Sequence, residues 1–256
     1  MIGGVVQQRL PSLLERPILF AHRGARAHAR ENTIEAFALG LRLGATGLES
    51  DVWITADGAV VLDHDGIVRI GRRKRSIAEC TADELPGHVP TLQRLFQECG
   101  TAFHLSLDLK QDGIGPAVVD AVRESAPDLL PRLWLCHPGV EELAALRPYD
   151  PSVKLVNSTR LARMSRGPER RAATLADLGI DAVNLHHTDW TGGLMALFHR
   201  FERVSFGWDM QFDYVLRPAI RMGIDGVFSD HVDVMVDALA AEYVPPGAVD
   251  IRSQIV

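Results

Sequence analysis

Short apolar stretches alternate with amphipathic stretches along almost the whole chain. Apolar runs bounded by turn-forming residues are typical of buried strands, and apolar positions recurring every three to four residues are typical of helices. Strands are predicted over residues 17–24, 47–52, 103–110, 132–137, 152–157, 181–187, 203–210 and 225–230. Helices are predicted over residues 32–44, 91–99, 114–125, 139–147, 168–178, 191–200, 211–222 and 232–241. Strands that alternate with helices build a parallel sheet, and eight such units predict an α/β fold, the (β/α)8 TIM barrel.

One segment, residues 52–65, departs from this alternation. Its sequence, VWITADGAVVLDHD, offers no helix after the second strand and contains the pair Asp57–Gly58 between two β-rich runs. Such a pair is a strong signal for a tight hairpin turn. We therefore predict a β-hairpin insertion after strand 2, which returns His64 to the end of that strand. Residues 66–90 read as a loop, and no linker is evident, so residues 1–256 are predicted to form a single domain.

The composition argues against several classes of protein. Hydrophobic residues make up 46% of the chain and charged residues 23%, as in ordinary globular proteins. The formal net charge of -6 argues against nucleic acid as a partner. No apolar run approaches the roughly 18–20 residues that span a bilayer. The N-terminal sequence lacks the basic start and the cleavage site of a secretory signal, so a cytoplasmic location is expected.

Polar residues interrupt two of the predicted strands in an alternating pattern. Because strand side chains point alternately to two faces, Glu49 and Asp51 share one face, and Asp108 and Lys110 share one face of the third strand. The carboxyl ends of barrel strands form the mouth where barrel enzymes work. Three carboxylates meeting there predict a divalent cation, and all-oxygen ligands favour Mg²⁺ or Ca²⁺. The alternative is a set of salt bridges, for example to Arg23 and Lys110.

Two histidines, His22 and His64, end the first strand and the predicted hairpin near this mouth. Histidine is suited to moving protons near neutral pH, and two histidines beside three carboxylates predict an acid–base pair. By strand alternation, Asp63 and Asp65 are expected to face away from His64, with roles in a turn or in supporting the site residues. Arg23 and Lys110 supply positive charge for an anionic substrate, since a guanidinium can hold two phosphate oxygens. Together these residues predict metal-assisted chemistry on a phosphate ester.

The same residues resemble the glycerophosphodiester phosphodiesterase family. The matching stretches are AHRG (21–24), ENTIEAF (31–37), GLESDVWITADGAVVLDHD (47–65), PTL (90–92), LDLK (107–110) and GIDGVFSD (223–230). Each piece alone is weak, but HRG, ENT, ExD and HD at this spacing form a highly specific combination. The resemblance implies a TIM barrel that uses a divalent metal to hydrolyse glycerophosphodiesters to glycerol 3-phosphate and an alcohol.

The resemblance also implies a role for each matching residue. His22 and His64 correspond to the acid–base pair of the family, and Glu49 and Asp51 correspond to two of its metal ligands. The remaining correspondences are Arg23 and Lys110 at the phosphate, Glu31 lining the site, and Trp208 at the substrate end.

The chain departs from the family pattern at four places. The third metal ligand is usually Glu, where this chain has Asp108, and Pro commonly precedes ENT, where this chain has Arg30. WDMQ (208–211) stands where the family usually has Trp followed by Thr-Val-Asn, and CHP (136–138) stands where the fourth strand often ends in Ser-Phe. We still expect Asp108 to be a metal ligand, and we expect an altered substrate pocket.

The residues leave other functions open. The basic run RIGRRKR (69–75) suits weak contact with an anionic membrane surface, which favours a lysophospholipase D or a sphingomyelinase-D-like enzyme acting on lipids. A solvated loop is the simpler interpretation of that run. A non-catalytic phosphate-binding barrel would account for Asp108 and the altered late strands. A zinc amidohydrolase would require a His-x-His pair on the first strand, which AHRG does not supply.

Overall fold

The computed structural model describes residues 9–243 and has a closed barrel of parallel strands. The strands are β1 (Ile18–His22), β2 (Gly47–Ile54), β6 (His104–Leu109), β7 (Leu133–His137), β8 (Lys154–Thr159), β9 (Ala182–His186), β10 (Val204–Trp208) and β11 (Gly226–Ser229). β1 pairs with both β2 and β11, so the sheet closes on itself. The predicted (β/α)8 TIM barrel is confirmed. The predicted domain also includes residues 1–8 and 244–256, which lie outside the described residues, so its extent stays a prediction.

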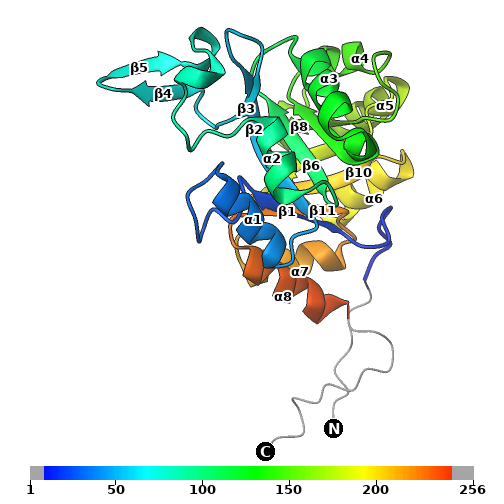
Figure 1. Cartoon of the computed structure of the whole chain (residues 1–256). Coiled ribbons are helices and arrows are strands. Elements are labelled where there is room, and N and C mark those ends of the chain that lie inside the picture. The colour runs from blue at the N-terminus through cyan, green and yellow to red at the C-terminus, as the bar shows by residue number, and fades with distance from the viewer. Residues whose placement is uncertain (1–8, 244–256) are drawn as a thin grey trace, which may run out of the picture.

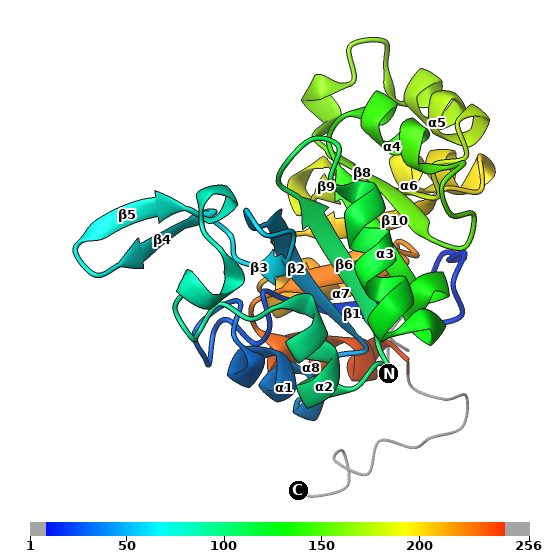
Figure 2. The same ribbon diagram turned by 45° about the horizontal axis from the view of Figure 1, so that its top comes forward.

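The helices pack around the outside of the barrel (Figures 1 and 2). They are α1 (Ile34–Arg42), α2 (Leu92–Cys99), α3 (Gly115–Ser125), α4 (Val140–Leu146), α5 (Pro168–Asp177), α6 (Gly192–Arg200), α7 (Asp213–Arg221) and α8 (Val232–Glu242). Short 3-10 helices cover Pro127–Arg132, Leu161–Arg163 and His187–Asp189. Each predicted barrel strand and helix is present, with its ends within two residues of the prediction. Within residues 9–243, no helix has both the length and the apolar character needed to cross a membrane.

Alternation along the strands separates two apolar cores. The leucines of β6 are buried between the barrel and the helices, as predicted: Leu105, Leu107 and Leu109. The barrel interior holds a second, smaller cluster in which Phe20 stacks on Phe228 with 4.5 Å between ring centroids. Because Phe228 also lines the pocket at the mouth, this aromatic layer closes the barrel beneath the polar residues.

The predicted hairpin insertion after β2 is confirmed. β3 (Val60–Leu62) runs antiparallel to β2, with Val52 opposite Leu62 and Ile54 opposite Val60. The connecting turn contains Gly58, whose φ of 86° lies in the left-handed region that glycine adopts without strain. The return strand therefore ends beside β2, close to the mouth of the barrel.

The prediction of a loop over residues 66–90 is wrong. This segment contains a second hairpin, β4 (Ile67–Ile70) and β5 (Arg73–Ser76), followed by 3-10 helices at Ile77–Glu79 and Ala82–Glu84. Figure 1 shows β4 and β5 projecting away from the barrel. Trp53 at the end of β2 packs against a small separate cluster that holds the segment in place: Val61, Val68, Ile77, Cys80 and Val89. Because these apolar residues are scattered among charged ones, no strand pattern is evident in this segment.

Candidate active site

A pocket of about 420 Å³ opens at the carboxyl ends of the barrel strands. Eight of the predicted site residues line it: His22, Arg23, Glu49, Asp51, His64, Asp108, Lys110 and Trp208. They come from the ends of different strands and from the insertion, so the closure of the barrel is what brings them together. The remaining predicted residue, Glu31, lies beside this pocket.

The three predicted metal ligands form one cluster. Asp51 and Asp108 are directly opposite each other in neighbouring strands, and one oxygen from each of Glu49, Asp51 and Asp108 lies within 4.8 Å of the others. Burial, together with the carboxylates of Asp51 and Asp108, outweighs the attraction of His22 and raises the pKa of Glu49 to about 8. Burial and the carboxylate of Asp51 also raise the pKa of Asp108. The cluster therefore needs positive charge if all three groups are to ionise near neutral pH.

Two basic side chains contact the cluster. Lys110 Nζ lies 2.8 Å from Asp51 Oδ1, and Arg23 Nε lies 3.3 Å from Asp51 Oδ2. The second contact lacks hydrogen-bond geometry, so Asp51 Oδ2 and Arg23 Nε are both buried without a hydrogen-bond partner in the part of the chain described. The salt bridges of the alternative interpretation are present, yet they leave an oxygen unsatisfied. Three close carboxylates with an unsatisfied oxygen fit a hard divalent cation, which takes oxygen ligands at roughly 2.0–2.6 Å.

His22 is held by a carboxylate that follows the last barrel strand. His22 Nδ1 lies 2.6 Å from Asp230 Oδ1, and His22 Nε2 lies 3.8 Å from Glu49 Oε2. Burial lowers the pKa of His22, but the Glu49 and Asp230 carboxylates outweigh it and raise the pKa above its usual value. The contact at Nδ1 fixes the ring so that Nε2 is the nitrogen nearer the carboxylate cluster.

His64 reaches the pocket from the insertion, as predicted. Its side chain is 38% exposed, compared with 26% for His22, so it lies nearer to solvent. Its Nδ1 lies 2.8 Å from Asp65 Oδ1, and the expectation that Asp65 faces away from it is wrong. The strand β3 ends before this point and the chain turns, with Asp63 Oδ1 accepting a hydrogen bond from the Gly66 N–H at 2.8 Å, so strand alternation no longer applies.

The loop after β1 positions Arg23 through an unusual backbone conformation. Arg23 and Asn32 have φ values of 52° and 53°, in the left-handed region that residues other than glycine seldom adopt. The Arg23 N–H donates to Glu49 Oε2 at 2.9 Å, and the Arg23 C=O accepts from the Asn32 N–H at 3.0 Å. These bonds compensate for the strained conformation and hold the residue against the cluster. Such strain is frequent at functional sites.

Glu31 contacts two arginines that line the pocket and does not line the pocket itself. Its carboxylate lies 3.2 Å from Arg23 Nη1 and 2.7 Å from Arg26 Nε, and both arginines line the pocket. Arg30, at the position where the family commonly has Pro, lies with its Nη2 2.8 Å from His88 Nε2. This contact joins the loop after β1 to the segment that precedes α2.

Trp208 lies where it was expected, at the end of β10, with its ring edge-to-face against His186 at 4.5 Å between the ring centroids.

Several pocket residues were not identified from the sequence. The additional polar residues that line the pocket are Arg26, Ser158, Asn184, Asp209, Gln211 and Asp230. Ser158 and Asn184 could have been found, because they are polar residues inside apolar strands and lie opposite each other in β8 and β9.

The sequence matches the model of the glycerophosphoryl diester phosphodiesterase family over residues 22–234. A similar curated protein is the putative glycerophosphodiester phosphodiesterase YhdW of Bacillus subtilis, with 24% identity over 241 residues that cover 85% of this chain and 96% of the relative. The glycerophosphodiester phosphodiesterase of Bacillus altitudinis is 23% identical over 235 residues, which cover 84% of this chain and 95% of the relative.

Solved structures share the fold. A putative glycerophosphoryl diester phosphodiesterase from Silicibacter pomeroyi has a TM-score of 0.78 and 25% identity, covering 92% of this chain and 96% of that one. An Oleispira antarctica phosphodiesterase, solved with the product sn-glycerol-3-phosphate, has a TM-score of 0.74 and 20% identity, covering 88% and 97% of the two chains. The family match includes every predicted site residue, and the predicted family and enzyme class are confirmed: the chain belongs to the glycerophosphoryl diester phosphodiesterase family, a family of phosphoric diester hydrolases.

Proposed function

We propose that this chain hydrolyses glycerophosphodiesters to glycerol 3-phosphate and an alcohol, with a divalent cation and with His22 and His64 as the acid–base pair. The observation that carries the proposal is the pocket, in which two histidines and two cationic side chains surround three carboxylates at the mouth of the barrel. The similar Bacillus altitudinis protein is a glycerophosphodiester phosphodiesterase, and the Oleispira protein was solved with glycerol 3-phosphate, which supports this choice of substrate.

Glu49, Asp51 and Asp108 would hold the cation, with Mg²⁺ or Ca²⁺ as the best fit. All three donors are carboxylate oxygens within 4.8 Å of one another, and Asp51 Oδ2 has no hydrogen-bond donor among the described residues. The shorter side chain of Asp108 still brings its oxygen into this cluster, which supports its assignment as a ligand. When bound, the cation would polarise the phosphoryl group and neutralise its charge.

The side chains of this protein would bind the phosphate and move the protons. Arg23 and Lys110 would contact phosphate oxygens, because both are only partly exposed and line the same pocket as the histidines. One histidine would take a proton from the attacking water as the water oxygen forms the new P–O bond. The other would give a proton to the oxygen of the leaving alcohol as its bond to phosphorus breaks. His22 would exchange its proton with the oxygen beside the carboxylate cluster, and His64 would exchange its proton with the oxygen nearer to solvent.

The size of the pocket supports a small-molecule substrate. Its volume of about 420 Å³ falls within the range of roughly 300–1,000 Å³ that is usual for small-molecule sites. Trp208 would contact the organic part of the substrate, since its ring lines the pocket at the end of β10. We propose no nucleic-acid partner, and the cytoplasmic location remains a prediction.

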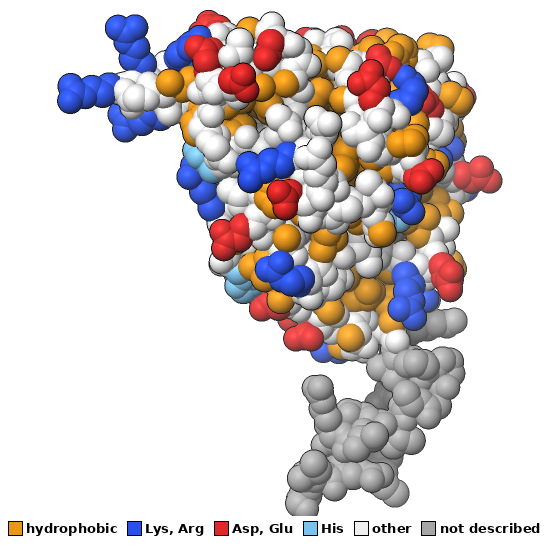
Figure 3. Space-filling model, viewed as in Figure 1, with side chains coloured by type: hydrophobic (Ala, Val, Ile, Leu, Met, Phe, Trp, Pro, Cys, Tyr) orange, Lys and Arg blue, Asp and Glu red, His pale blue; other side chains and the backbone are white. Residues whose placement is uncertain are grey.

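A phosphodiester carried by a lipid is the second candidate, because the β4–β5 hairpin suits an anionic surface. It carries five basic residues and no acidic one: Arg69, Arg72, Arg73, Lys74 and Arg75. Figure 3 shows basic side chains gathered on the arm that projects from the barrel. Ile67, at the start of β4, is 56% exposed. Juxtamembrane basic clusters bind anionic lipid at roughly 1 kcal/mol per residue, so we propose weak contact with such a membrane.

One assay separates these candidates. Release of the alcohol would be measured from a panel of glycerophosphodiesters and lysophospholipids, after chelation and after addition of Mg²⁺ or Ca²⁺. The second product would be glycerol 3-phosphate from a glycerophosphodiester and lysophosphatidate from a lysophospholipid. We expect chelation to abolish turnover and one of the ions to restore it; full activity in a thoroughly chelated sample would exclude the metal-dependent mechanism. No release from any substrate with metal present would favour a non-catalytic phosphate-binding barrel.

The membrane contact has its own test. Pelleting with phosphatidylserine vesicles should exceed pelleting with phosphatidylcholine vesicles, and Arg72→Glu with Lys74→Glu should remove the difference. Arg166→Glu with Arg170→Glu, at exposed positions before and within α5 and away from the hairpin, is the control with the same change in charge. Equal pelleting of the hairpin variant and the control would remove the support for the lipid substrate.

A further inference from the structure

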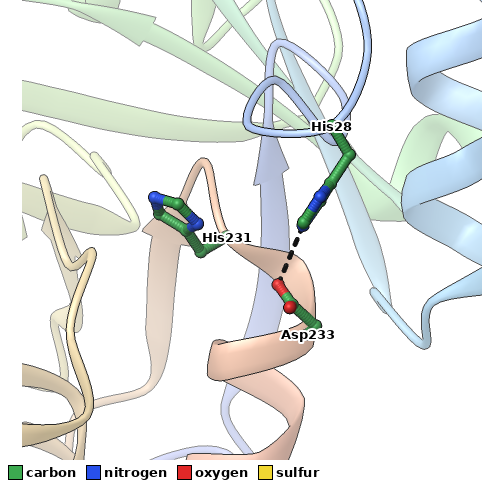
Figure 4. Close-up of side chains that lie close together, drawn as sticks. All are labelled: His28, His231 and Asp233. Carbon is green, nitrogen blue, oxygen red and sulfur yellow. Dashed lines mark hydrogen bonds and ion pairs between the residues drawn. The ribbon is translucent and has the colours of Figure 1, made fainter.

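A second group of potential metal ligands lies outside the catalytic pocket. His28 lies in the loop after β1, and His231 and Asp233 lie at the junction of β11 and α8 (Figure 4). One ligand atom from each residue lies within 4.8 Å of the other two. His28 Nε2 is 3.0 Å from Asp233 Oδ1, and the two imidazole rings meet edge to face with 6.2 Å between their centroids. Two segments from opposite ends of the sequence thus bring two imidazoles and a carboxylate together.

We propose that His28, His231 and Asp233 bind a transition-metal dication, with Zn²⁺ as the best fit. Two imidazole nitrogens and one carboxylate oxygen suit Zn²⁺, Co²⁺, Ni²⁺ or Cu²⁺ better than Mg²⁺ or Ca²⁺. Zinc commonly takes three protein ligands and leaves a fourth position to water. The donor set differs from the all-carboxylate cluster of the pocket, whose oxygen ligands favour a hard ion such as Mg²⁺ or Ca²⁺.

The geometry is close to what a bound ion requires. Zn–N bonds of about 2.0–2.1 Å at tetrahedral angles place ligand atoms roughly 3.3 Å apart. The 3.0 Å between His28 Nε2 and Asp233 Oδ1 already approaches that spacing. The side chains of His28 and Asp233 are 39% and 49% exposed, so packing does not prevent the small rotations that close the set on an ion. The N-terminus of α8 opposes a cation, but the carboxylate of Asp233 in its first turn offsets that effect.

An ion at this site would connect the loop after β1 to the segment whose Asp230 contacts His22. Asp230, whose carboxylate contacts His22 Nδ1, directly precedes His231 in the chain. The Asp230 C=O accepts a hydrogen bond from the Ala27 N–H at 3.2 Å, and Ala27 directly precedes His28. A metal bound by His28 and His231 therefore clamps both sides of this backbone contact. The clamp stabilises the mouth of the barrel without touching the substrate.

The test is a zinc titration of the full chain. The chain is stripped of metal by chelation and kept in millimolar Mg²⁺, which occupies the carboxylate cluster; Zn²⁺ binding is then followed by calorimetry and Tm in parallel. We expect one zinc site and a Tm that rises with Zn²⁺ concentration, because a ligand of the folded state stabilises it. His28→Ala and His231→Ala should each weaken zinc affinity about tenfold or more and suppress the rise in Tm. Co²⁺ should show the absorption of a four-coordinate ion, which the same variants lose.

His186→Ala is the matched control. His186, His187 and Asp209 form another cluster whose ligand atoms lie within 4.8 Å of one another, so nonspecific binding by histidine clusters would affect both sets equally. Unchanged zinc affinity in His28→Ala and His231→Ala, or loss of the site in His186→Ala, would overturn the proposal. Asp233→Asn, which keeps the side-chain shape, replaces any alanine variant whose circular dichroism shows misfolding. Failure of this proposal would leave the hydrolase assignment untouched, since that assignment is tested by turnover with Mg²⁺ or Ca²⁺.

Discussion

Replacement of Asp230 by Asn tests whether this residue positions His22 for proton transfer. Asp230 Oδ1 lies 2.6 Å from His22 Nδ1, and the two side chains are 23% and 26% exposed. Asparagine keeps the shape of the side chain but removes the charge that holds the ring. Because the Asp230 carboxylate contributes to raising the pKa of His22, the limb of the pH–rate profile that belongs to His22 should move to lower pH in this variant.

The size of the effect follows from the strength of the contact. A hydrogen bond to a charged group contributes about 1.5–3 kcal/mol. Since a tenfold change in rate corresponds to about 1.36 kcal/mol, kcat should fall roughly 10- to 150-fold if the contact is fully used in the transition state. KM should change little, because the main phosphate contacts are assigned to Arg23 and Lys110.

Asp65→Asn is the matched comparison. Asp65 makes the corresponding contact with His64 Nδ1 at 2.8 Å, but it is 78% exposed. Exposed ion pairs contribute about 0–1 kcal/mol, so kcat should fall less than about fivefold. Steady-state release of glycerol 3-phosphate across the pH range of the folded protein checks both variants. Turnover of Asp230→Asn within about twofold of wild type, with an unshifted pH profile, would show that the contact is structural only.

Three further outcomes are expected. Asp108→Ala should raise the metal concentration required for half-maximal turnover about tenfold or more, whereas Asp108→Glu should keep measurable activity; an unchanged requirement in Asp108→Ala would indicate two carboxylate ligands only. Burial lowers the pKa of His104, so below pH 6.5 this residue binds more protons in the unfolded chain than in the folded protein. The free energy of unfolding in urea should therefore fall as the pH drops below 6.5, and it should fall less in His104→Gln. Gly66 has a φ of 66°, and a Cβ added there would lie 2.4 Å from the Trp53 ring. Gly66→Ala should therefore lower the free energy of unfolding by about 2 kcal/mol or more. Gly71 has a φ of 61° but open space around it, so Gly71→Ala should lower the free energy of unfolding only by the backbone strain.

The barrel could be predicted from the sequence because one local rule repeats along the chain. Buried apolar residues recur along each strand, and glycines at helix ends, such as Gly44 and Gly179, stop the helices cleanly. The convergence of Glu49, Asp51 and Asp108 could also be predicted from the sequence. Side chains alternate between the two faces of a strand, and β2 and β6 are neighbouring strands, so these three carboxylates lie on the same face and close together.

The contacts that were missed depend on packing between distant segments. The β4–β5 hairpin is held by Trp53 and a few scattered apolar residues rather than by a periodic pattern. Asp230 lies 208 residues from His22 in the sequence, and only the closure of β1 against β11 brings them together. That pairing could have been deduced, because the first and last strands of a closed barrel are neighbours and these two residues both follow their strands at the mouth.

Without a bound cation, the carboxylate cluster should lower the free energy of unfolding of the protein. Replacement of Glu49 by Gln tests this. Burial and its neighbours raise the pKa of Glu49 from 4.5 to about 8, so without a cation the folded state keeps this group protonated at pH 7 while the unfolded state ionises it. At pH 7 the unfolded chain ionises this group about 2.5 pH units above its ordinary pKa of 4.5. At 1.36 kcal/mol per unit, the protonated group therefore lowers the folding stability at pH 7 by about 3 kcal/mol. The chelated wild type should therefore lose stability as the pH rises from 4.5 toward 8, whereas chelated Glu49→Gln should lose less and be the more stable protein at pH 7. Addition of Mg²⁺ or Ca²⁺ should reverse the order, because only the wild type presents the full set of carboxylates to the ion. Equal stability of the two proteins in both conditions would mean that the cluster is neutralised by Arg23 and Lys110 alone.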